Sequence, residues 1–166
     1  SFPTRRSSDL DQAVDYAIYV DGSADNLNKT PRGGAGIVIV NAAGQCIAEH
    51  IVPILHHPFC TNNLAELIGV EQALVLIKNL PIKSSIKIFL DSTYVLNHLI
   101  GRQIKFGQPN YQKVVQICQI HDQIVNLGYQ ITLHHIEAHK GHQWNELADR
   151  LANEGRTMPI KEYPNN

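Results

Sequence analysis

The sequence predicts an α/β domain in which helices cover one sheet. Apolar runs of strand length alternate with amphipathic helical stretches, in the order βββαβααβα. The chain has 166 residues, which is the size of one domain and enough to bury a core. Apolar residues make up 43% of the chain and charged residues 17%. This composition is typical of a globular protein, and it excludes disordered and fibrous classes.

Three strands are expected first, joined as an antiparallel meander. Tyr16–Val20 and Gly36–Val40 are short runs rich in aromatic and β-branched residues. The segment 41–44, Asn-Ala-Ala-Gly, has the composition of a turn and leads into a third run at Gln45–Val52.

The later elements follow from helical periods and from the residues that begin and end helices. Thr61 or Asn62 can cap a helix that ends before Pro81. The remaining expected elements are a strand at Ser85–Leu90, helices at Thr93–Ile100 and Asn110–Asn126, a strand at Tyr129–Ile136, and a last helix at Gln143–Glu154, ending before Gly155.

Both ends of the chain are expected to lie outside the folded domain. Residues 1–12 show no helical or strand period, and we interpret them as a non-native or disordered leader. The domain then covers residues 13–155, and residues 156–166 form a loosely ordered tail.

The charge and the cysteines narrow the class of protein. Lys and Arg number 14 against 15 Asp and Glu, so no overall positive field favours nucleic acid or an acidic membrane, and local clusters must hold any polyanion. No apolar run approaches the roughly 18–20 residues that span a bilayer. We therefore expect a cytoplasmic, monomeric protein without a membrane partner. Cys46, Cys60 and Cys118 form no CxxC pair, and we expect small buried side chains rather than disulfides or a zinc ribbon.

Four acids fall where an α/β sheet collects ligands. Asp21 is expected directly after the first strand and Asp91 directly after the fourth, with Glu66 in the first turn of the long helix and Asp149 inside the last helix. Carboxylates a few ångströms apart repel one another, and a divalent cation relieves that repulsion. Oxygen ligands favour Mg²⁺ or Mn²⁺ over zinc. Taken singly, each acid also fits a turn residue or a favourable charge at a helix N-terminus.

Four short motifs surround these acids in chain order. They are Asp21-Gly22-Ser23, Thr61-Asn62-Asn63-Leu64-Ala65-Glu66-Leu67, Asp91-Ser92-Thr93-Tyr94-Val95, and His139-Lys140-Gly141-His142-Gln143-Trp144-Asn145-Glu146-Leu147-Ala148-Asp149. From about Tyr16 to Gly155 the chain strongly resembles type 1 ribonuclease H, of bacterial or retroelement type. The resemblance implies a ribonuclease H-like fold, with a five-stranded mixed sheet in the order 3-2-1-4-5 flanked by helices.

The resemblance also implies an activity and a set of catalytic residues. The activity is hydrolysis of the RNA strand of an RNA–DNA hybrid by two metal ions, leaving 5′-phosphate and 3′-hydroxyl ends. The implied metal ligands are Asp21, Glu66, Asp91 and Asp149, which would hold two Mg²⁺ ions, with Mn²⁺ as a substitute. His139 corresponds to the loop histidine that assists turnover, and its titration near neutral pH suits proton transfer.

Amide side chains are the candidates for recognising the hybrid. Asn62 and Asn63 match the asparagines that contact the minor groove in this family, and we also expect Ser92 and Asn145 to contact the substrate. An A-like duplex presents its 2′-hydroxyls in a wide, shallow minor groove, where amides can donate and accept hydrogen bonds.

The sequence departs from the family pattern in places. The loop 24–34 is longer than the bacterial type, and residues 102–107 form a shortened version of the basic handle. Thr93 stands where many relatives carry Gln, and Leu64 where bacterial ones often carry Arg. His134, His135, His139 and His142 also allow a zinc site, but adjacent residues of a strand point to opposite faces.

Two other functions compete with the nuclease. One is a transposase or integrase core of the same superfamily, whose acids have a different order and spacing. The other is a catalytically inactive ribonuclease H-like domain that binds nucleic acid within a reverse transcriptase. The chain also allows a fused reverse transcriptase or a hybrid-binding module lost by truncation.

Overall fold

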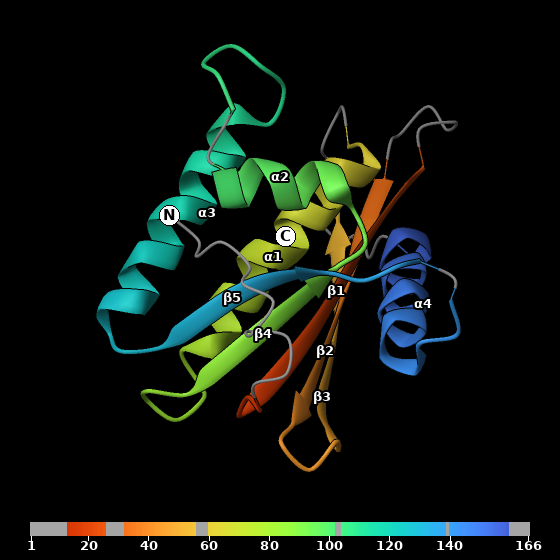
Figure 1. The fold of residues 1–166 in the computed structure, drawn as a ribbon. Coiled ribbons are helices and arrows are strands. Elements are labelled where there is room, and N and C mark those ends of the chain that lie inside the picture. Colours follow the sequence, from red (N-terminus) through yellow and green to blue (C-terminus); the bar gives the residue numbers. More distant parts are fainter. Residues whose placement is uncertain (1–12, 26–31, 56–59, 102–103, 139, 160–166) are drawn as a thin grey trace, which may run out of the picture.

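The computed structural model describes residues 13–25, 32–55, 60–101, 104–138 and 140–159. One five-stranded sheet has the order β3-β2-β1-β4-β5, as the sequence resemblance implied (Figure 1). β1 pairs antiparallel with β2, and β2 with β3, whereas β4 pairs parallel with both β1 and β5. The elements are β1 (Tyr16–Asp25), β2 (Arg32–Asn41), β3 (Cys46–Ile54), α1 (Asn62–Ile77), β4 (Ser85–Leu90), α2 (Thr93–Gly101), α3 (Tyr111–Asn126), β5 (Gln130–His135) and α4 (Gln143–Thr157).

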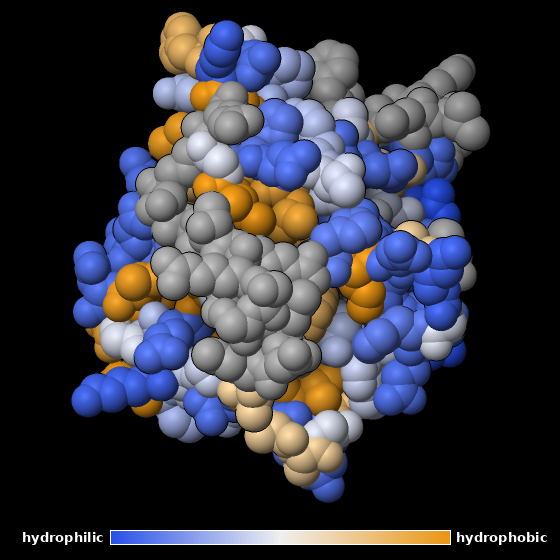
Figure 2. All heavy atoms as spheres, viewed as in Figure 1, coloured by the Kyte–Doolittle hydropathy of each residue, from blue (hydrophilic) through white to orange (hydrophobic). Residues whose placement is uncertain are grey.

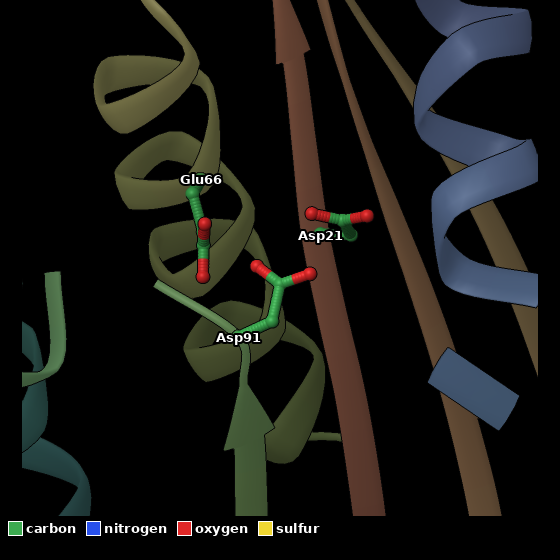
Figure 3. A group of neighbouring side chains, drawn as sticks. All are labelled: Asp21, Glu66 and Asp91. Carbon is green, nitrogen blue, oxygen red and sulfur yellow. The ribbon is translucent and has the colours of Figure 1, made fainter. Parts of the chain in front are cut away.

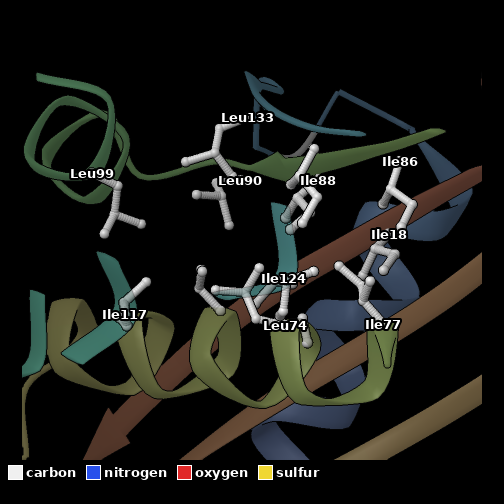
Figure 4. Close-up of a cluster of buried hydrophobic side chains, with 14 of the residues drawn as sticks. Ile18, Leu74, Ile77, Ile86, Ile88, Leu90, Leu99, Ile117, Ile124 and Leu133 are labelled. Atoms are coloured by element: carbon white, nitrogen blue, oxygen red, sulfur yellow. The ribbon is translucent and has the colours of Figure 1, made fainter. Parts of the chain in front are cut away.

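The helices cover the two faces of the sheet unequally. Helices α1, α2 and α3 lie on one face and α4 lies on the other (Figure 1). The larger apolar core lies under the three helices, where Ile18 and Ile88 of the sheet meet Leu74 and Ile77 of α1 (Figure 4). Alternation along β1 and β2 directs every second residue to this core and the others toward α4.

Helix α4 packs against the sheet through residues with little or no side chain. A Cβ atom at Gly36 would lie 2.1 Å from the carbonyl oxygen of Ala148, and one at Gly34 would lie 2.2 Å from that of Ala152. The helix backbone therefore rests almost directly on β2, which only glycine permits at these two positions. This contact fixes the depth and the register of α4.

The first two strands are longer than the sequence pattern predicted. β1 continues through Asp21 to Asp25, and β2 begins at Arg32 rather than at Gly36. The expectation that Asp21 directly follows the first strand was therefore wrong. The antiparallel pairing of β1 and β2 continues because it needs only backbone groups. At Gly34 and Gly36 of β2, the α4 backbone leaves no room for the β-branched side chains that mark a strand in the sequence.

Two residues that commonly end elements lie inside them here. Pro53 belongs to β3, an edge strand in which a missing backbone N–H is tolerated. Helix α4 passes through Gly155 and ends at Thr157, because Gly155 serves close packing against β2 and β3 rather than ending the helix.

The surface and the cysteines can be compared with what the sequence predicted. Apolar side chains on the face seen in Figure 2 form separate patches among polar ones. Among the helices that the structure describes, none combines the length and the hydrophobicity that crossing a bilayer requires. Cys60 and Cys118 are buried and Cys46 is partly buried, and all three are free thiols.

Adding one methyl group at the contact between α4 and β2 tests this packing. We expect Gly36→Ala to lower the free energy of unfolding by about 1–3 kcal/mol, because the new Cβ overlaps the α4 backbone. Urea denaturation measures the change. Gly44→Asn is the control, because Gly44 lies in an open turn with a positive φ of 79° that Asn tolerates. Equal effects of the two substitutions would contradict the packing argument.

Candidate active site

Asp21 lies at the centre of the candidate site. It follows Tyr19, the last residue of β1 that pairs with β4, so it stands at the edge where the parallel part of the sheet ends. Its side chain is 6% exposed, and its Oδ1 accepts a hydrogen bond of 2.8 Å from the backbone N–H of Gly22. Asp21 therefore lies where the parallel pairing of β1 and β4 ends, although β1 itself continues.

Glu66 reaches Asp21 because helix α1 lies against β1. A Cβ atom at Gly22 would lie 2.2 Å from the backbone nitrogen of Glu66, so the helix can come this close only at a glycine. Thr61 caps the helix by accepting a 3.1 Å hydrogen bond from Leu64. Glu66 is the fifth residue of α1 and not part of its first turn, which corrects our expectation. It is 4% exposed and points into the site, so it is not a surface charge at the helix N-terminus.

Asp91 completes a group of three carboxylates. It follows the last residue of β4, as predicted, and its side chain points toward Asp21 and Glu66 (Figure 3). One oxygen from each of the three lies within 4.8 Å of the others. This spacing is close enough for all three to contact a shared cation.

Asp149 approaches the group from the opposite face of the sheet. The contact of α4 with Gly36 brings Asp149 close to Asp21, and this proximity helps to raise the pKa of Asp21. Asp149 does not belong to the three acids whose oxygens all lie within 4.8 Å of one another. All four predicted acids thus come to one place, with Asp21 between the acids of the two helices.

Crowding and burial make these acids harder to ionise. Burial, followed by the charge of Asp91 and contact with Asp149, raises the pKa of Asp21 from 3.8 to about 8. Burial and the charges of Asp91 and Asp21 raise the pKa of Glu66 well above its ordinary value. The hydrogen bonds from Gly22 to Asp21 and from Ser92 to Glu66 lower these pKa values, but by less than burial and the neighbouring acids together raise them. A bound cation would reverse the effect of the neighbouring charges.

The residues present fit a divalent metal ion. Three carboxylates converge, and their oxygens are the hard ligands that Mg²⁺ and Mn²⁺ prefer. Among the described residues, no histidine or cysteine belongs to this group, so the zinc interpretation gains no support.

The polar residues beside the acids are held in defined orientations. The side-chain oxygen of Asn62 accepts a 2.7 Å hydrogen bond from the backbone N–H of Ala24. The side-chain oxygen of Asn63 accepts one of 3.3 Å from the Ser92 hydroxyl. Ser92 also donates its backbone N–H to Glu66 and accepts from the N–H of Val95. Ser92 therefore links an amide at the surface to a carboxylate of the acid group.

The remaining candidate residues lie on α4 or outside the described part of the chain. Asn145 is 4% exposed, and its Oδ1 is buried without a hydrogen-bond partner, one helical turn before Asp149. This buried position was not expected for a residue predicted to contact substrate. His139 lies outside the described residues, as do Asn26 and Asn28 of the loop 24–34. Trp144 is partly buried against the apolar cluster under α4.

Sequence reasoning missed two residues that hold the site together. Gly22 belongs to the first motif, but only the contact with α1 gives the reason for it. Asn153 on α4 accepts a 2.9 Å hydrogen bond from the Ser23 hydroxyl, which ties the helix to β1 beyond Asp21. Its position one turn after Asp149 was the available signal.

Known structures first identify the class of fold. LC11-RNase H1, isolated from compost by a metagenomic approach and solved with an RNA/DNA hybrid, superimposes with a TM-score of 0.68 at 24% identity, covering 85% of this chain and 96% of that one. The foamy viral protease-reverse transcriptase, also solved with an RNA/DNA hybrid, gives a TM-score of 0.71 at 22% identity, covering 87% of this chain and 20% of that one. The fold is therefore ribonuclease H-like.

Sequence comparison identifies the family. Residues 13–157 match the RNase H family. The ribonuclease H of Acidovorax sp. (strain JS42) is 34% identical over 148 residues, covering 83% of this chain and 92% of the relative. The chain belongs to the ribonuclease H family, as its four motifs indicated, and this membership implies dependence on a divalent metal.

The raised pKa values predict how stability depends on pH without metal. The pKa of Asp21 is 3.8 ordinarily and about 8 when folded, so its stabilising contribution is complete below 3.8 and is lost as pH rises through 8. In EDTA, we expect the free energy of unfolding of the wild type to fall relative to that of Asp21→Asn from pH 5 to pH 9. Urea denaturation at each pH measures the difference.

The control for this pH series is Glu49→Gln, which removes an exposed carboxylate from β3. Its stability should follow that of the wild type across the series. A constant difference between the wild type and Asp21→Asn at all pH values would contradict the shifted pKa.

Proposed function

We propose that this domain hydrolyses the RNA strand of RNA–DNA hybrids, leaving 5′-phosphate and 3′-hydroxyl ends. The observation that carries the proposal is the convergence of buried acids next to a row of oriented amides. Membership of the ribonuclease H family and likeness to folds solved with RNA/DNA hybrids support it.

Asp21, Glu66, Asp91 and Asp149 would hold two Mg²⁺ ions, with Mn²⁺ as a substitute. When bound, the ions would supply activation of the attacking water and stabilisation of the departing 3′ oxygen. Asp21 occupies the central position, since it contacts the acids of both faces of the sheet. Because burial excludes water from Asp21 and Glu66, little solvent competes for their oxygens.

Recognition of the hybrid rests on hydrogen-bond donors. The side-chain oxygens of Asn62 and Asn63 accept hydrogen bonds from Ala24 and Ser92, so we assign the NH₂ group of each amide to the contact with substrate. These donors suit the acceptors of a minor groove, which are base N3 and O2 atoms and the lone pairs of 2′-hydroxyls. The hydroxyl of Ser92 is committed to Asn63 and Val95, so we assign Ser92 to orienting Asn63.

The remaining assignments complete this proposal. His139 would move a proton or assist product release, because an imidazole titrates near neutral pH. The contact of Asn145 with substrate stays a prediction, and the buried Oδ1 of Asn145 is not exposed to make it in this structure. The cytoplasmic location, the monomeric state, the fused or lost modules and the division into leader 1–12, domain 13–155 and tail 156–166 stay predictions.

A binding module without activity is the main competing function. The convergence of the four acids favours the enzyme over this module, because a module that only binds nucleic acid has no need of a cluster of buried carboxylates. A hybrid-cleavage assay distinguishes the two functions. An inactive module would bind the hybrid equally well with and without Mg²⁺ and would leave it intact. Cleavage of duplex DNA in the same assay would favour the transposase or integrase class.

Loss of one central acid tests the assignment of the ligands. We expect Asp21→Asn and Asp91→Asn to reduce Mg²⁺-dependent hybrid cleavage below detection, because each removes a ligand oxygen and a negative charge. Without metal, both variants should be at least as stable as the wild type, since repulsion is relieved. Glu154→Gln, an exposed acid on α4, is the control and should cleave normally. Near-normal turnover by either Asp variant would overturn the assignment.

An isosteric change at Asn62 separates its two roles. Asn62→Asp keeps the oxygen that accepts from Ala24 but removes the outward NH₂ donor. We expect the KM for hybrid to rise about tenfold, which corresponds to about 1.4 kcal/mol of lost binding, with thermal stability unchanged. Asn79→Asp, an exposed change after α1, controls for the added charge. Unchanged KM in Asn62→Asp would exclude a donor role.

A further inference from the structure

A row of aromatic rings crosses the sheet on the face that α4 covers. Tyr19 of β1 stacks on Phe89 of β4, with ring centroids 4.9 Å apart and planes 12° from parallel. Phe89 in turn contacts His134 of β5 at 5.4 Å. The three residues are neighbours in the parallel register, so their contacts follow from strand pairing.

This row is close to the acids along the chain. Tyr19 and Phe89 precede Asp21 and Asp91 by two residues. Within β1, Tyr19 and Asp21 point to the same face, whereas Asp91 lies just beyond the end of β4. His134 likewise precedes Ile136, whose backbone N–H donates a 2.8 Å hydrogen bond to Leu90 at the end of β4. The rings of Tyr19 and Phe89 are thus two residues from carboxylates of the site along the chain.

The row continues to the start of α4. The ring of His142, the residue before α4, lies 5.1 Å from that of Tyr19. The carbonyl oxygen of His142 accepts a 3.0 Å hydrogen bond from Glu146, which closes the first turn of the helix. Tyr19 therefore contacts the point from which the chain enters the helix that carries Asn145 and Asp149.

The contact with Tyr19 is also the one that orients His142. His142 makes no side-chain cap bond to α4, and its Nδ1 is buried without a hydrogen-bond partner. Packing against the Tyr19 ring therefore contributes to the position of this side chain. Ile136 is held by its hydrogen bond to Leu90, and His142 contacts Tyr19.

We infer that Tyr19 is a positioning residue for the reaction, because its ring seats His142 and thereby sets the first turn of α4 over the acids. The inference rests on the proposed function. The ring, and not the hydroxyl, does this work, since the contacts of Tyr19 with Phe89 and His142 are both ring contacts.

The test compares four variants on an RNA–DNA hybrid with Mg²⁺. Tyr19→Leu should lower kcat about tenfold or more through misplacement of the α4 side of the site, with little change in KM. Tyr19→Phe keeps the ring and should restore kcat. His142→Leu should show the same loss as Tyr19→Leu, and the double variant should lose no more than either, because both changes break one contact.

A control separates positioning from loss of stability. Leu74→Ala removes a buried side chain from the core on the opposite face, so it should lower the melting temperature but leave kcat unchanged in the folded protein. Full kcat in Tyr19→Leu would overturn the inference. So would multiplied losses in the double variant, or a Tyr19→Phe variant as slow as Tyr19→Leu.

A second measurement does not depend on activity. Hydrogen exchange of the Glu146 backbone N–H in metal-free protein should be faster in Tyr19→Leu than in the wild type and Tyr19→Phe. If the wild type cleaves no hybrid, the proposed function fails, while this exchange still tests the contact. Equal exchange in all three proteins would overturn the positioning role.

Discussion

Close backbone contact at three glycines is the constraint on which the site depends. Helix α1 rests on Gly22, and helix α4 rests on Gly34 and Gly36. Each helix approaches one face of the same pair of strands and brings one acid with it, Glu66 or Asp149. A side chain at any of these glycines would move a helix outward, and the distance between its acid and Asp21 would grow with it.

The rest of the fold must hold together a site that opposes folding. Asp21 and Glu66 are buried beside other acids, which destabilises the ionised chain in the absence of cations. The core under α1, α2 and α3 compensates, because each large aliphatic side chain buried there contributes about 1.5–3 kcal/mol. The same repulsion makes cation binding favourable, so low stability and metal affinity have one electrostatic origin.

The polar surface next to the acids is organised by hydrogen bonds that leave little freedom to its side chains. Asn62 is fixed to the end of β1 through Ala24, and Asn63 is fixed to the turn before α2 through Ser92. Ser92 bonds to Glu66 as well, so the amides and the acids belong to one connected network. On the other face of the sheet, the ring of Tyr19 packs against Phe89 and against His142, the residue before α4.

The motifs by themselves identified the family, and the resemblance that they carry implied the strand order and named the four acids that the fold brings together. The cap of α1, predicted at Thr61 or Asn62, also depends on local sequence alone, and Thr61 provides it. Only the tertiary structure decided that β1 runs past Asp21, that α4 passes through Gly155 and that Ser92 turns inward. These features depend on backbone approach between distant segments. A small residue that permits such contact looks the same in the sequence as one that ends a strand or a helix.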